Sequence, residues 1–307
     1  MRVSIPDTKT EGDENVMENV SNKWTQFIPA LFVFLWSTGF IGAKFALPYI
    51  EPFYLLFLRI TLTVVVFGLL MWWYKAPWMS KRQFGHQAVS GLLIHGAYLG
   101  GVFSAVAYSM PAGVIALLVS VQPLLTALIL FRTKPIKALQ WLGLALGFIG
   151  VVIVLLSKGA IADFTFNWPM MIGALVALLG ITVGSLYQKR FGEGVNLLSA
   201  STAQYIVTAL LMAVLTYSFE HQQVDWQLPL IASLLWLVFG MSVLAILLLL
   251  YMIENGASEK VASYFYLVPG ITAIQAWLYF DEQFPPLAIG GMLLSLLGVY
   301  LTVKTKT

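Results

Sequence analysis

The residues of this chain that could do chemistry are few, and they stand alone within long apolar stretches. Arg59 is the only charged residue inside such a stretch, and His95 lies centrally in another. An ionisable side chain is costly in a bilayer and usually faces the protein interior or a water-filled cavity. Histidine is also the side chain that titrates near neutral pH. These two positions are therefore the first candidates for a binding or coupling site.

Each of the two positions allows two interpretations. Arg59 would anchor a substrate carboxylate, or it would snorkel to the membrane surface or pair with Glu51. Because Arg59 lies near the start of its predicted helix, we favour the second interpretation. His95 would be a proton-coupling group or a hydrogen-bond partner of the substrate, or it would be a neutral histidine satisfied by a neighbouring helix. The sequence favours neither interpretation of His95.

Two other stretches place polar or aromatic side chains shortly before a proline. Gln122 is next to Pro123, and the run 263–266 ends three residues before Pro269. A proline inside a helix removes a backbone hydrogen bond and permits a kink, so we predict hinges at both prolines. Aromatic side chains in such places would line a cavity or simply pack. The predicted substrate-binding residues are Trp36, His95, Tyr98, Gln122, Ser263, Tyr264 and Tyr266, with Arg59 and His95 as the anchor or coupling candidates.

The composition sets the class of protein. Of the 307 residues, 59% are hydrophobic and 10% are charged, whereas soluble domains have about 25% charged residues. This excludes ordinary soluble enzyme domains, disorder of the whole chain and nucleic-acid binding. There is no cysteine, which excludes thiolate metal ligands and cysteine nucleophiles. The phosphate-binding loop and zinc-protease motifs are absent too, so we predict no enzyme, no cofactor and no metal.

Runs without Asp, Glu, Lys or Arg predict the architecture. A helix needs about 20 apolar residues to cross a membrane. Eight such runs are that long, and one of them, 83–131, is long enough for two spans that would meet at the turn residues 109–113. A further span, 52–74, is interrupted only by Arg59. We therefore predict an all-α membrane protein with ten transmembrane helices, preceded by a polar, disordered cytoplasmic tail at 1–23.

The positive charges predict the orientation. With ten spans both termini lie on one side, and that side would carry 14 of the 17 Lys and Arg residues. The opposite side would carry only Lys44 and Lys158. Positive loops stay in the cytoplasm, so we predict cytoplasmic termini and a multi-pass protein of the plasma membrane, a bacterial inner membrane. Lys44 and Lys189 end their helices and would gate the cavity or be solvated, and we favour solvation.

Residue pairs recur at a nearly constant offset of 145 to 148 residues. The pairs are Gly39 and Lys44 with Gly184 and Lys189, Ala116 and Pro123 with Ala262 and Pro269, and Gly143 and Gly150 with Gly291 and Gly298. They predict two five-helix repeats, 27–157 and 167–304. Five is odd, so the second repeat would be inverted, as in many secondary transporters. The glycine faces would serve packing within the chain or a homodimer.

Several of these segments together resemble one transporter family. They are the run 36–44, the Pro-Ala-Gly at 111–113, the Gln-Pro-Leu at 122–124 and the run from Ala262 to Pro269. Over residues 27–304 the chain is similar to the drug/metabolite transporter superfamily, EamA type. The resemblance implies ten helices, an inverted five-plus-five arrangement and export of small metabolites across a bacterial inner membrane.

The predicted function is therefore secondary export of small amphipathic metabolites, amino acids or their derivatives first, by alternating access. The predicted partners are a small-molecule solute, the lipid bilayer, a proton as coupling ion and a second copy of the chain. One alternative is efflux of drugs or organic cations, which would need an acidic partner that the middles of the spans lack. The other alternative is a membrane scaffold that transports nothing.

Overall fold

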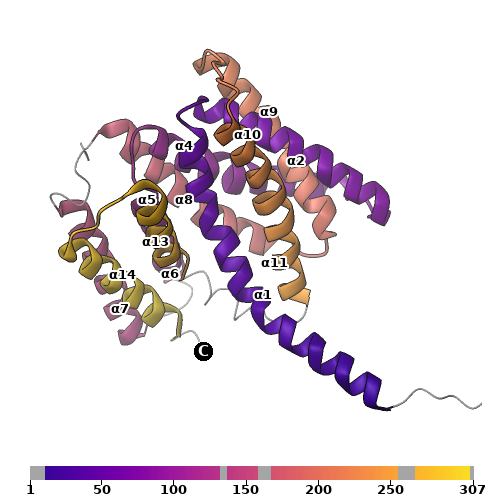
Figure 1. Ribbon diagram of the computed structural model, residues 1–307, viewed down its shortest axis with the longest axis horizontal. Coiled ribbons are helices and arrows are strands. Elements are labelled where there is room, and N and C mark those ends of the chain that lie inside the picture. Colours follow the sequence, from indigo (N-terminus) through magenta and orange to yellow (C-terminus); the bar gives the residue numbers. More distant parts are fainter. Residues whose placement is uncertain (1–10, 132–136, 158–166, 255–266, 305–307) are drawn as a thin grey trace, which may run out of the picture.

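The computed structural model describes residues 11–131, 137–157, 167–254 and 267–304, in which short loops connect helices and there is no strand. A single isolated antiparallel bridge, between Ile50 and Val224, joins two loops. The predicted all-α class is confirmed. Figure 1 shows the helices gathered into one bundle, from which the N-terminal part of α1 projects.

The first half of the chain forms α1 (Glu11–Ala46), α2 (Pro52–Tyr74), a third helix made of α3 (Lys81–Gly91), η1 (Leu92–Ala97) and α4 (Tyr98–Ala107), then α5 (Ala112–Ser120), α6 (Gln122–Leu130) and α7 (Ala138–Leu156). The second half forms α8 (Trp168–Phe191), α9 (Leu197–Phe219), a helix made of α10 (Leu228–Leu235), η2 (Trp236–Leu244) and α11 (Ala245–Glu254), then α13 (Val268–Phe280) and α14 (Pro286–Lys304).

Seven of these helices are long and apolar enough to cross a membrane: Phe27–Ala46, Pro52–Tyr74, Lys81–Ala107, Ala112–Leu130, Trp168–Phe191, Leu197–Phe219 and Leu228–Leu248. Ala138–Val154 and Pro286–Thr302 are shorter apolar helices. The predicted helical membrane architecture is thus found with seven candidate spans, and ten spans remain a prediction. Side chains at the helix ends, such as Trp72, Trp168 and Phe219, are largely exposed, as side chains at a membrane interface would be.

The N-terminal segment differs from the prediction for it. α1 begins at Glu11, so residues 11–23, which we expected to be disordered, are helical. A helix that is already nucleated in the apolar span extends one residue at a time at little cost. Residues 1–10 lie outside the described part of the chain.

Local sequence signals define the helix ends. Ser80 and Gln83 form a capping box at the start of α3. Asn167 and Asn196 accept backbone N–H bonds at the starts of α8 and α9. At its other end, α13 stops where Asp281 adopts the left-handed conformation, with φ of 52°. These caps fix the loops that carry the charged residues at the helix ends.

Two helices are widened in the middle rather than broken. η1 and η2 are π-helical turns, in which each backbone bond spans one residue more than in an α-helix. Such turns occur frequently at functional sites. His95 lies in η1 and Ser242 lies in η2.

The helices pack through small residues. α7 lies along α14, α2 along α9, and α4 along α8, while α1 packs against α10 and α13. A Cβ added at Gly150 would lie 2.5 Å from the Gly291 oxygen, and one at Gly143 would lie 2.6 Å from the Gly298 oxygen. The two predicted glycine faces therefore meet each other within one chain (Figure 1).

Candidate substrate-binding site

A cavity of about 100 Å³ lies where α1, α2, η1, α4, α9 and η2 meet. Its polar and aromatic lining comprises Trp36, Phe40, Arg59, His95, Tyr98, Phe103 and Tyr205. The volume is below the roughly 300–1,000 Å³ of small-molecule pockets, and it corresponds to about three water molecules.

Arg59 points into the protein. Its side chain is only 5% exposed, on the buried face of α2 that also includes Leu55, Leu56 and Thr63. The guanidinium donates from Nε and Nη2 to the Ser242 hydroxyl at 3.3 and 3.2 Å, and it lies 5.9 Å from the centre of the Phe103 ring.

The interpretation of Arg59 that we favoured from the sequence is wrong. The side chain does not snorkel outward, because it belongs to the inward face of its helix. It does not pair with Glu51 either, since that carboxylate accepts the backbone N–H groups of His221 and Gln223. The distance of a residue from the predicted helix end is a poor guide to which way its side chain points.

No carboxylate within the described ranges comes close enough to form an ion pair with Arg59; the ion pair found in them joins Lys44 to Glu282. A buried charge is costly unless an opposite charge or several hydrogen bonds compensate it. One hydroxyl shared by two N–H groups is a weak compensation. The Arg59 guanidinium therefore presents to the cavity a positive charge that an anionic group of a ligand would neutralise.

His95 is held from one side and borders the cavity on the other. Its Nε2 lies 3.1 Å from Gln204 Oε1, and its ring stacks on Tyr205 with centres 4.4 Å apart. Gln204 in turn donates from Nε2 to Gln87 Oε1 at 2.7 Å. A neighbouring helix therefore does satisfy one nitrogen of His95, while the ring lines the cavity.

The other predicted site residues divide into three groups. Trp36 and Tyr98 line the cavity, and the Trp36 ring lies 5.4 Å from that of Phe32. Gln122 does not line the cavity. Its Nε2 donates to Ser185 Oγ at 2.9 Å and so joins α6 to α8. Ser263, Tyr264 and Tyr266 lie outside the described residues.

Four residues near the cavity escaped the sequence analysis: Gln87, Gln204, Tyr205 and Ser242. Gln204, Tyr205 and Ser242 are polar or aromatic residues inside apolar spans, which is a usable signal because such residues usually face the interior. Which of them meet across helices is a tertiary property, and it could not be foreseen.

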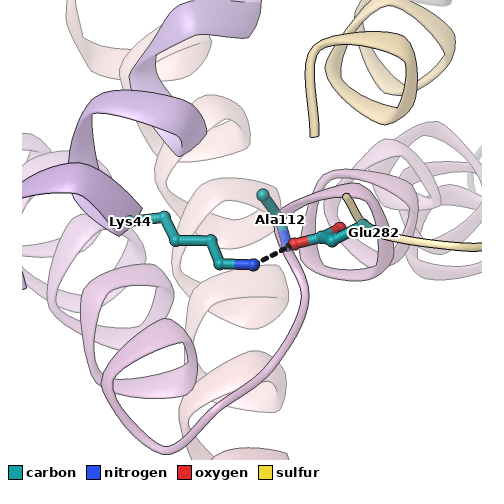
Figure 2. A network of polar contacts seen from close by, with 3 residues as sticks. All are labelled: Lys44, Ala112 and Glu282. Carbon is teal, nitrogen blue, oxygen red and sulfur yellow. Dashed lines mark hydrogen bonds and ion pairs between the residues drawn. The ribbon is translucent and has the colours of Figure 1, made fainter. Parts of the chain in front are cut away.

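An ion pair lies at the ends of α1 and α13, between Lys44 and Glu282 (Figure 2). Lys44 Nζ lies 2.5 Å from Glu282 Oε1 and 4.5 Å from the centre of the Phe280 ring. The same oxygen accepts the backbone N–H of Ala112 at the start of α5, at 3.1 Å. The side chain of Glu282 is 3% exposed and that of Lys44 is 30% exposed. Solvation, which we favoured for both helix-end lysines, is therefore wrong for Lys44, whereas Lys189 is exposed.

The two predicted hinges differ in what the structure describes. α5 ends at Ser120 and α6 begins at Gln122, so the helix is interrupted at Val121, two residues before Pro123. Pro269 is the second residue of α13, and the residues that precede Leu267 lie outside the described ranges. The kinks and hinge roles at both prolines remain proposals.

A third acidic residue anchors the loop after α9. The Glu220 carboxylate accepts the backbone N–H groups of Phe53 and Tyr54, both at 2.7 Å, and so caps α2 from another part of the chain. Burial raises the pKa of Glu220, the two backbone bonds lower it, and nearby Glu51 raises it further. The net effect is a pKa above the usual carboxyl range.

Comparison with known proteins identifies a family and several relatives of this chain. The model of the EamA-like transporter family matches twice, at residues 23–156 and 164–304. An "Uncharacterized transporter YvbV" of Bacillus subtilis is 26% identical over 95% of each chain. A "Probable amino-acid metabolite efflux pump" of Salmonella typhimurium is 23% identical over 90% of this chain and 94% of its own.

The fold has a counterpart among solved structures. A crystal structure that is 18% identical in sequence superposes with a TM-score of 0.64 and covers 91% of this chain and 96% of that one. At this identity the likeness concerns the fold alone. Because the family model covers nearly the whole chain, this protein belongs to the EamA-like transporter family, as the resemblance implied, and it is a membrane transporter.

Proposed function

We propose that this protein is a secondary active exporter of small amphipathic metabolites, and of amino acids or their derivatives before other solutes. One observation carries the proposal: a buried arginine without a carboxylate partner in the described residues lines a cavity together with His95 and aromatic rings. Such a lining suits a solute with an anionic end and an apolar body. The efflux-pump relative supports the same solute class.

The proposed mechanism is alternating access by two inverted five-helix repeats, 27–157 and 167–304. The two matches to the family model support this division. The packing supports the inversion, since Gly39 of α1 faces Met241 of η2, and Gly184 of α8 faces Ile94 of η1. Gly39 and Gly184 are the paired glycines of the two repeats, and each one contacts the π-helical turn of the opposite repeat. We place the hinges at Pro123 and Pro269.

The orientation follows from the charges, and we propose cytoplasmic termini in a bacterial inner membrane. The Lys44–Glu282 cluster then lies on the outer side, where it would close the cavity toward the exterior. Since α7 and α14 use their glycine faces on each other, a homodimer would have to form through another surface. We propose no enzymatic activity.

A proton is the coupling ion that we propose, exchanged at His95. The charged and titratable groups that share the cavity with it are Arg59, Tyr98 and Tyr205, without a carboxylate in the described ranges. We expect His95→Gln to lose the response of counterflow to an imposed pH gradient, while counterflow itself continues with a higher KM because the amide oxygen still offers the solute an acceptor. Persistence of that response would remove His95 from the coupling step.

The function itself is tested by counterflow in proteoliposomes loaded with pooled amino acids, their derivatives and organic cations. We expect accumulation of amino acids or their derivatives, and none of simple organic cations, because the described lining offers a cation and no anion. Accumulation of organic cations alone would support the drug-efflux alternative. Absence of all flux from a monodisperse, reconstituted protein would support a scaffold.

A further inference from the structure

Two buried glutamines and the half-buried His95 form a line of hydrogen bonds that leads from the cavity to α3. Gln87 of α3 accepts a bond from Gln204 of α9, and Gln204 accepts the bond from His95 of η1. Gln87 is 1% exposed and Gln204 is 4% exposed. Neither glutamine lines the cavity, so neither would touch a solute there.

The hydrogen bonds between His95, Gln204 and Gln87 have a direction. Gln204 uses its amide nitrogen as the donor to Gln87, so the oxygen of the amide faces His95. A carbonyl oxygen only accepts hydrogen bonds, so this orientation of the Gln204 amide requires a proton on His95 Nε2. In a neutral imidazole the other nitrogen is then an acceptor. His95 Nδ1 makes no hydrogen bond to the described residues.

We propose that Gln204, supported by Gln87, is a positioning residue that fixes the His95 tautomer, so that the cavity presents an acceptor, Nδ1, as well as a cationic donor, Arg59. This rests on the proposed function and refines it. The ligand that fits both groups carries an anionic carboxylate and a hydrogen-bond donor in the same molecule. A neutral α-amino acid in its zwitterionic form has both, and its ammonium group would face the imidazole and the neighbouring aromatic rings.

The inference predicts a rank order among compounds that compete for one site. Leucine has both groups, its des-amino analogue 4-methylpentanoate has only the carboxylate, and its decarboxylated analogue isoamylamine has only the ammonium group. A site that is built to bond both groups rejects analogues that lack one, because a buried partner is left unpaired. We expect leucine to compete at least tenfold better than either analogue in counterflow of labelled leucine.

The glutamine chain is tested with Gln204→Met, which keeps the side-chain volume and removes both hydrogen bonds. We expect the preference for leucine over 4-methylpentanoate to fall to about threefold or less, through a higher KM for leucine at similar maximal rate. Gln140→Met is the matched control, since Gln140 is a buried glutamine that bonds the Thr302 oxygen far from the cavity. It should keep the wild-type preference.

A spectroscopic measurement tests the tautomer independently of transport. The chain has 3 histidines, so nitrogen-15 labelling of histidine gives few signals, and His95→Gln assigns those of His95. At neutral pH we expect a protonated Nε2 and a bare Nδ1, and a mixture of tautomers in Gln204→Met. A proton on Nδ1 in the wild type, or an unchanged preference in a folded Gln204→Met protein, would overturn the inference. Absence of counterflow with every solute of the pooled panel would instead refute the proposed function, while the spectrum still reports the tautomer.

Discussion

Two positive charges of the molecule lie in different surroundings: Lys44 is 30% exposed at the end of α1, whereas Arg59 is buried beside the cavity. At the end of α1, Lys44 meets the Glu282 carboxylate, and a backbone N–H of α5 bonds the same oxygen. In the cavity, the hydrogen bonds of the Arg59 side chain to the described residues go to the hydroxyl of Ser242 alone, and the Phe103 ring lies beside the guanidinium. The protein's own carboxylate neutralises Lys44. The charge of Arg59 is not neutralised by a described carboxylate, as expected for a site in which a ligand supplies the negative charge.

The largest expected effect comes from removing the charge of Arg59. Arg59→Met should abolish measurable leucine counterflow, because losing one partner of a desolvated charge pair costs about 2–5 kcal/mol of binding. The fold should not suffer, since an uncompensated buried charge disappears with the substitution. Arg82→Met, at an exposed arginine of α3, is the matched control and should transport normally. Normal transport by Arg59→Met would show that the solute does not need the charge of Arg59, and would contradict the difference proposed between Arg59 and Lys44.

A large effect of another kind is expected at the Lys44–Glu282 cluster. Glu282→Gln leaves the cluster without its anion, and we expect the outer side of the cavity to open more often. The chain has no cysteine, so a single cysteine placed at Leu99, which lines the cavity, reports access. Labelling by an impermeant maleimide from outside should speed up severalfold in Glu282→Gln.

A double-mutant cycle tests whether the ion pair between Lys44 and Glu282 is what keeps the labelling rate low. Adding Lys44→Met to Glu282→Gln should restore part of the closure, with an interaction free energy of about 0.5–3 kcal/mol in a double-mutant cycle. Purely additive effects of the two substitutions on the labelling rate would show that the ion pair does not hold the outer side closed.

A smaller effect is expected from the helix that follows Glu282. α14 begins four residues after it and is seated on α7, where a Cβ at Gly150 would collide with the backbone of Gly291 and Ser295. Gly150→Val should lower the melting temperature, because overpacking costs about 1–3 kcal/mol. Gly290→Val is the matched control, since nothing lies within 4 Å of a Cβ there. Equal melting temperatures would mean that this contact does not support the Lys44–Glu282 cluster.

The smallest effect concerns a carboxylate that no lysine or arginine pairs with in the described residues. Burial raises the pKa of Glu220, so the folded protein holds this proton more tightly than the unfolded chain does. Stability from this group is therefore full below the ordinary carboxyl pKa and falls as pH rises through the raised value. Melting curves across the acidic range should show this slope in the wild type and lose it in Glu220→Gln. An identical slope in both proteins would contradict the assignment.

The sequence predicted the class of fold and part of the site. Uncharged runs locate the long apolar helices, because crossing a bilayer imposes a length and a composition on each segment. Rarity of polar groups in those runs pointed to Arg59 and His95, and both line the cavity. The direction of Arg59 was misjudged, because it depends on the packed face of α2 rather than on depth along it.

Partners across helices could not be predicted. The bond between His95 and Gln204 joins residues 109 positions apart, and the Lys44–Glu282 pair joins residues 238 apart. Gln122 resembled a site residue through its place beside Pro123, yet it bonds Ser185 instead. Such pairings arise from how the helices cross, which a single sequence does not encode in any local pattern.

The central claim is that solutes bind in the cavity beside Arg59 and His95, and protection of a cysteine there from labelling tests it most directly. With cysteine at Leu99, a transported amino acid should slow maleimide labelling at the concentrations that compete in counterflow. A cysteine at Leu211, which lines a separate, more open hollow between α4, α8 and α9, should be labelled at the same rate with or without the amino acid. Transport without any protection at Leu99 would contradict the account.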